Sequence, residues 1–172
     1  GAERGTVDVA RTLTEEGWHS LVVSSGGPMV RELTRAGVNH IEMPVESKNP
    51  LVMHANVDRL ARIIRDHQVD IVHARSRAPA WSGLAACRRT NTSFVTTFHG
   101  TYDTSLPFKR TYNSVMTRGQ RVIAASDFIA RHLVDTYNTS PDRITVIHRG
   151  VDFDLFDPQK ISPERLVKHS QD

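Results

Sequence analysis

Hydrophobic and polar positions follow two different periods along the 172 residues of the chain. Short runs rich in β-branched residues predict buried strands. Between these runs, apolar residues return at helical spacing, as Val57, Leu60, Ala61 and Ile64 do. The predicted strands are 20–24, 38–41, 69–73, 94–98, 121–125 and 144–147, and the predicted helices are 7–17, 29–36, 51–67, 78–89, 108–116 and 128–137.

This alternation of strands and helices predicts an α/β fold, a Rossmann-like, doubly wound parallel sheet with helices on both faces. The chain opens on Gly1-Ala2-Glu3-Arg4-Gly5-Thr6, which is typical of the turn that follows a strand. We therefore expect the first strand, the central one in such a sheet, to be missing. Residues 1–152 form the predicted domain, and 153–172 are expected to be a linker or the start of a missing C-terminal domain.

Composition narrows the classes of function. The chain is 38% hydrophobic and 24% charged, which suits one globular domain with a real core. Its net charge of +3 favours anionic partners such as phosphates or an acidic membrane surface. Cys87 is the only cysteine, so an intrachain disulfide is excluded and a reducing, cytoplasmic location is the simplest expectation. No apolar run approaches the roughly 20 residues that a membrane-spanning helix needs.

Candidate chemistry lies where the strands end, because open parallel sheets bind ligands outside the carboxyl ends of their strands. The loops 73–77, 99–102, 126–127 and 148–150 hold many of the histidines and arginines. The nucleotide-hydrolase pattern G-x-x-x-x-G-K-[ST] and the dinucleotide pattern G-x-G-x-x-G are absent, as are G-x-S-x-G and H-E-x-x-H. Serine or zinc hydrolysis therefore has no basis in the sequence.

Each candidate residue also has an ordinary structural interpretation. His99 ends a buried strand and could only bond a neighbouring carbonyl, or it could face a ligand. Arg75 and Arg77 could be solvated loop charges. Ser126 precedes a helix and fits an N-cap, which can share the helix terminus with a phosphate. Trp18 is more typical of packing than of ligand stacking.

Taken together, five segments resemble the N-terminal domain of retaining GT-B glycosyltransferases of family 4. They are GAERGT at 1–6, HARS at 73–76, TFHG at 97–100, VIAASDFI at 122–129 and VIHRGVD at 146–152. Arg149 stands where the family usually has Asn.

The resemblance implies a role for each loop. His99 matches the catalytic histidine that faces the donor sugar, while Gly100 would leave room for that sugar. The donor and phosphate-binding side would include Gly1, Glu3, Gly100 and Ser126. The acceptor side would include Arg75, Ser76 and Tyr102.

The implied reaction is transfer of a sugar from a nucleotide donor to a hydroxyl acceptor with retention of anomeric configuration. Helix N-termini and basic side chains would stabilise the departing diphosphate, so no cofactor or obligatory metal is expected. The expected partners are a nucleotide sugar and a glycan or glycolipid acceptor, as in lipopolysaccharide or cell-envelope biosynthesis. Peripheral contact with an anionic membrane fits the basic charge, and no nucleic acid is expected.

The family's glutamate pair, spaced E-x7-E in the second domain, has no counterpart here. The 172 residues alone are therefore expected to be inactive. Two alternatives remain open at this stage: a non-catalytic module that binds an anionic lipid or nucleic acid, and a GT-B-like sugar-nucleotide epimerase. Salt-sensitive binding without sugar-nucleotide specificity would indicate the first.

Overall fold

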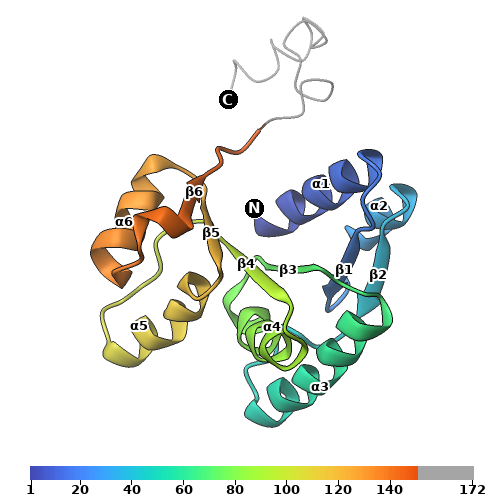
Figure 1. The fold of residues 1–172 in the computed structure, drawn as a ribbon, viewed down its shortest axis with the longest axis horizontal. Helices are drawn as coiled ribbons and strands as arrows, with labels where there is room; N and C mark the ends of the chain where they lie inside the picture. The colour runs from blue at the N-terminus through green and yellow to red at the C-terminus, as the bar shows by residue number, and fades with distance from the viewer. Residues whose placement is uncertain (151–172) are drawn as a thin grey trace, which may run out of the picture.

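The computed structural model describes residues 1–150 (Figure 1). The predicted linker at 153–172 lies outside the described residues. All six predicted strands are present, namely β1 (Leu21–Ser24), β2 (Asn39–Glu42), β3 (Ile71–Ala74), β4 (Ser93–Phe98), β5 (Arg121–Ala124) and β6 (Ile144–Val146). Every strand pair is parallel.

The strands form two sheets instead of the single sheet that the sequence predicts. One has the order β1-β2 and the other β3-β4-β5-β6. Within residues 1–150, β1 and β3 are not hydrogen-bonded to each other. The β1–β2 pair is therefore separate from the four strands of the larger sheet.

Helices connect successive parallel strands, as the crossover geometry of a parallel sheet requires. Figure 1 shows α1 and α2 beside the small sheet, and α3 next to α4. The helices are α1 (Ala2–Glu15), α2 (Val30–Arg35), α3 (Pro50–Asp66), α4 (Arg77–Thr90), α5 (Pro107–Asn113) and α6 (Asp127–Tyr137), with short 3-10 turns at Ser114–Thr117 and Pro141–Arg143. The Rossmann-like prediction is confirmed, since helices cover both faces of parallel sheets.

The main core lies under the four-stranded sheet. Phe94 and Phe98 from β4, Val122 from β5 and Leu133 from α6 are all fully buried. A smaller cluster packs α1 against α2. Since β4 is buried along most of its length, the residue that follows Phe98 is fixed relative to the core.

Salt bridges add to the packing of α1 on α2. Arg4 donates to one carboxylate oxygen of Asp8 at 2.7 and 2.9 Å and to Glu32 of α2 at 2.5 Å. The paired carboxylates raise the pKa of Arg4. The interpretation of Trp18 as a packing residue is wrong, because this side chain is 67% exposed beyond the end of α1.

Candidate active site

The carboxyl ends of the four parallel strands bring the candidate residues to one edge of the large sheet. Arg75 follows β3, His99 follows β4, Ser126 follows β5, and Arg149 lies three residues beyond β6. Parallel pairing sets this arrangement, since all four strands end on the same side. Residues more than seventy positions apart in the sequence thus lie in one neighbourhood.

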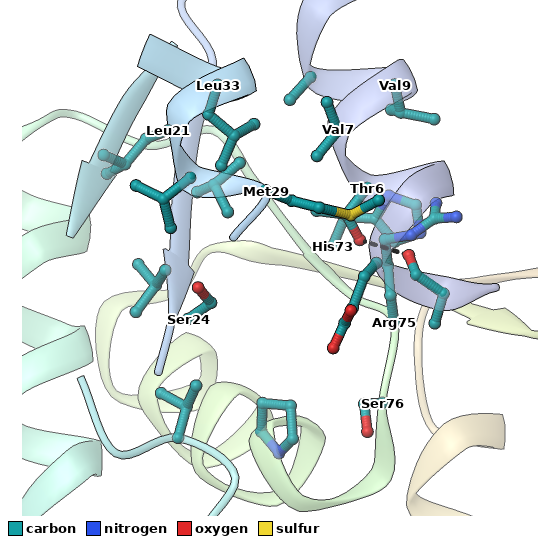
Figure 2. A pocket seen from close by; sticks show the side chains of 18 of the residues that line it. Thr6, Val7, Val9, Leu21, Ser24, Met29, Leu33, His73, Arg75 and Ser76 are labelled. Carbon is teal, nitrogen blue, oxygen red and sulfur yellow. Dashed lines mark hydrogen bonds between the residues drawn. The ribbon is translucent and has the colours of Figure 1, made fainter. Parts of the chain in front are cut away.

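A pocket of about 540 Å³ opens between α1, α2, β1 and β3. Figure 2 shows Leu21 and Leu33 on one side of it and His73, Arg75 and Ser76 on the other. The apolar side follows the gap between the two sheets. The polar side lies at the carboxyl end of β3 and suits a polar ligand, so we assign the candidate site to that end.

His99 is held neutral by its surroundings. Burial is the main cause that lowers its pKa to about 4, and the positive charges of Arg75 and Arg149 lower it further. Nη2 of Arg149 donates to Nδ1 of His99 at 2.7 Å. Because arginine only donates, Nδ1 must be the accepting nitrogen and the ring proton resides on Nε2. At neutral pH His99 therefore carries no positive charge, and its Nε2–H is buried without a hydrogen-bond partner within residues 1–150.

Arg75 lies against the first turns of α1. A Cβ at Gly5 would come within 2.7 Å of Nη2 of Arg75, so the guanidinium lies directly against the backbone of α1 at this position. Burial and the charge of Arg149 lower the pKa of Arg75, while Asp8 acts in the opposite direction. The side chain is neither a freely solvated loop charge nor part of any ion pair within residues 1–150.

His73 is a second partly buried histidine at this edge, and no individual role was assigned to it from the sequence. Its Nε2 lies 2.7 Å from Oγ1 of Thr97, across the β3–β4 pair. Burial, followed by the charges of Arg75 and His99, lowers its pKa to about 4. Its position at the end of β3, two residues before Arg75, is the sequence signal that could have identified it.

Tyr102 is half-buried on the loop that leaves β4. Its ring centroid lies 4.7 Å from that of Phe98, and the guanidinium carbon of Arg77 lies 4.3 Å from the Tyr102 centroid. Arg77 also donates to Oδ1 of Asn113 at 2.8 Å, and Asn113 donates to the Asp103 carbonyl at 3.0 Å. These contacts fasten the loop next to His99. Neither Arg77 nor Asn113 was assigned a role from the sequence.

The other predicted site residues divide into those with a structural role and those facing open space. Ser126 accepts a hydrogen bond from the Ile129 backbone at 3.3 Å, so it is the N-cap of α6 as expected. A Cβ at Gly100 or at Gly1 would meet nothing within 4 Å, which leaves that space open to a ligand.

Glu3 and Ser76 are both exposed, and both line the pocket. Glu3 lies in the first turn of α1, and Ser76 is the N-cap residue of α4 without a side-chain capping bond. Their predicted roles toward a donor and an acceptor remain predictions.

No group of three histidine, cysteine or carboxylate side chains within residues 1–150 is placed to hold a metal ion. None of the helices in the same range has both the length and the apolar character to cross a membrane.

Comparison with solved structures places this domain among the GT-B glycosyltransferases. A glycosyltransferase from Rickettsia africae ESF-5 is 47% identical in sequence, with a TM-score of 0.82, and the match covers 98% of this chain and 45% of that one. Anabaena HepE, solved with UDP-glucose, is 19% identical with a TM-score of 0.76, and the match covers 99% and 45% of the two chains. A UDP-N-acetylglucosamine 2-epimerase from Rickettsia bellii, at 14% identity and a TM-score of 0.63 over 95% and 47%, shares the fold alone.

The chain belongs to Glycosyltransferase Family 4, whose family model matches residues 1–155. This confirms the family resemblance inferred from the sequence. The chain spans less than half the length of the solved structures named above. No curated protein matches it in sequence.

Proposed function

We propose that this chain is the acceptor-side domain of a nucleotide-sugar-dependent, retaining glycosyltransferase that acts on a cell-envelope glycan or a lipid-linked acceptor. Membership of Glycosyltransferase Family 4 and the 47% identity to a glycosyltransferase support the reaction class. The domain would act together with a second, nucleotide-binding domain, because it lacks the family's E-x7-E pair. A cytoplasmic location and catalysis without an obligatory metal are parts of the same proposal.

The mechanism depends on His99 at the end of β4, where burial lowers the pKa of the ring to about 4. Transfer from a nucleotide sugar builds positive charge at the sugar ring and negative charge on the departing diphosphate. A positively charged histidine would oppose the first, whereas an uncharged imidazole can hydrogen-bond the sugar without adding charge. Burial and two neighbouring arginines keep the pKa of His99 near 4 and so maintain the neutral form.

Backbone donors suit the departing diphosphate. The N-cap of α1 is Gly1, which has no side chain that could cap the helix. The N–H groups of the first turn therefore remain available to an anion. UDP-glucose is the first donor to test, because the HepE structure holds that compound.

We place the proposed membrane contact on the start of α5. Leu106 and Phe108 are 44% and 67% exposed. Lys109 and Arg110 follow them directly. Apolar side chains beside cations suit the surface of an anionic bilayer. Phe108→Ser should weaken sedimentation of the protein with vesicles of anionic lipid and leave binding of a nucleotide sugar unchanged.

The test of the enzymatic proposal is sugar transfer by the full-length protein that contains this domain, measured over a panel of nucleotide sugars. We expect turnover with retained anomeric configuration, lost in His99→Ala while the fold persists. Turnover without an acceptor that yields an epimerised sugar nucleotide would instead establish an epimerase. Salt-sensitive binding of anionic lipid or polymer, with no turnover of any donor, would establish a binding module.

A further inference from the structure

Arg75 and Arg149 form a pair of like charges without a carboxylate partner among residues 1–150. Each lowers the pKa of His99, and Arg149 lowers the pKa of Arg75. Among residues 1–150, Asp8 is the carboxylate that raises the pKa of Arg75. Asp8 already accepts two hydrogen bonds from Arg4 and belongs to the salt bridges that join α1 to α2. The positive charges of Arg75 and Arg149, at the carboxyl ends of β3 and β6, are therefore not balanced by a carboxylate within residues 1–150.

The Arg75 side chain is partly desolvated and incompletely bonded. Its Nε is buried and has no hydrogen-bond partner within the part of the chain that the structure describes. A buried, unsatisfied donor on a charged group costs free energy, which an acceptor oxygen would recover. The guanidinium lies directly against the backbone of α1, because a Cβ at Gly5 would come within 2.7 Å of Nη2 of Arg75.

Arg149 is oriented by the histidine of the candidate site. Nη2 of Arg149 bonds to Nδ1 of His99 at 2.7 Å, which leaves its other N–H groups without an assigned acceptor within residues 1–150. Arg149 contacts the His99 ring, and the charges of both Arg75 and Arg149 act on that ring. Guanidinium groups suit the oxygens of a tetrahedral anion, because each can donate two parallel N–H bonds to phosphate. A single asparagine amide at position 149 would supply no charge.

We propose that Arg75 and Arg149 together bind a phosphate group at the carboxyl ends of β3 and β6, with His99 as the residue that positions Arg149. The source of the phosphate rests on the proposed function: it is either the diphosphate of the sugar donor or a phosphate on the acceptor. Both sources offer the same chemistry to the two arginines, and binding experiments separate them.

The experiment measures binding of inorganic phosphate and of pyrophosphate to the 172-residue chain by calorimetry, with no sugar nucleotide present. Arg75→Gln and Arg149→Gln should each weaken binding by about tenfold or more, which is the loss expected for one charge-assisted hydrogen bond. Arg149→Lys, which keeps the charge without the planar fork, should recover part of the loss. Arg88→Gln, at an exposed position of α4, is the matched control and should bind as the unsubstituted chain does.

Competition then identifies the source. Displacement of inorganic phosphate by UDP, but not by glycerol phosphate, assigns the site to the donor. Displacement of inorganic phosphate by glycerol phosphate, but not by UDP, assigns the site to the acceptor. The proposal is overturned if the unsubstituted chain binds neither phosphate nor pyrophosphate, or if both glutamine variants bind as tightly as Arg88→Gln.

Phosphate binding and sugar transfer can fail independently. Arginine-dependent phosphate binding without turnover by the full-length protein would support the phosphate site and contradict the proposed enzymatic function. If Arg75→Gln and Arg149→Gln both keep turnover and phosphate affinity, the enzymatic function would be supported and the phosphate site contradicted. The circular dichroism spectrum and urea midpoint of each variant confirm that its fold is intact.

Discussion

The Arg77 guanidinium lies over the ring of Tyr102, with 4.3 Å between its central carbon and the ring centroid. Arg77 begins α4, whereas Tyr102 lies on the loop that follows His99. The stack therefore joins α4, the helix that follows β3, to the loop that follows β4. It also explains why Tyr102 is half-buried, and burial is what raises the pKa of its phenol.

Arg77→Met should destabilise the protein and loosen this loop. The substitution keeps an unbranched apolar stem but removes the cation and the hydrogen bond to Asn113, whose side chain is only 1% exposed. Loss of the stack and of that bond should lower the free energy of unfolding in urea by about 1–3 kcal/mol. Proteolysis within 100–106 should become faster. Arg88→Met is the control, and equal effects in the two variants would contradict the prediction.

Lowering the pH from about 6.5 to 4 should reduce stability through His73 and His99. Both have a pKa of about 4 in the folded chain, against an ordinary value of 6.5, and burial is the main cause in each case. The unfolded chain therefore takes up protons first as the pH falls through 6.5. Stability is fully present above pH 6.5, falls between 6.5 and 4, and receives no further loss from these two groups below 4.

Urea denaturation at several pH values measures this loss. His73→Gln and His99→Gln should each flatten the dependence between pH 6.5 and 4, because glutamine does not titrate. His54→Gln, at an exposed position of α3, serves as the control. A slope in this window that survives both glutamine substitutions would refute the assignment.

Gly119 occupies a site where the backbone itself leaves no space. A Cβ there would lie 2.7 Å from the Arg121 carbonyl oxygen and 2.9 Å from that of Phe94. Since backbone atoms of two strands cannot move aside cheaply, Gly119→Ala should cost about 1–3 kcal/mol in the free energy of unfolding. Gly100→Ala meets open space and should leave the urea midpoint unchanged.

The substitutions Gly100→Ala and Gly119→Ala also test the candidate active site. In the full-length protein, Gly100→Ala should reduce sugar transfer without a change in stability, because the new methyl group occupies space beside His99. Gly119→Ala should lower stability while the remaining folded fraction transfers sugar normally. Full activity of Gly100→Ala would show that the donor sugar does not approach this position.

The sequence predicts the strands and helices well because each depends on local patterning. Ser126 could be assigned as an N-cap for the same reason, since the capping bond reaches only three residues along the chain. From the sequence we expect one sheet that lacks its central strand, whereas the structure has two separate sheets, because the pairing of strand edges depends on contacts in space. Trp18 was misjudged, since hydrophobic character alone does not show that a partner surface exists beside it.

The electrostatics of the site depend on contacts that no local pattern contains. His99 and Arg149 are fifty positions apart, and their hydrogen bond follows from the parallel order of β4, β5 and β6. From sequence, Arg149 is only a departure from the family's usual Asn. Similarly, Gly5 matters through Arg75, seventy residues away. Strand order therefore had to be known before these residues could be related.

Arg149→Gln should raise the pKa of His99 toward its ordinary value. Arg149 lowers this pKa by its charge, while burial and Arg75 continue to act in the variant, so the rise should be partial. The titration can be followed by the NMR signals of the His99 ring in the isotopically labelled chain. His73, whose pKa is lowered by burial, Arg75 and His99, should change much less and provides an internal control. An unchanged His99 pKa would mean that the Arg149 guanidinium does not act on the ring in solution, and the two arginines could not then serve as one phosphate site.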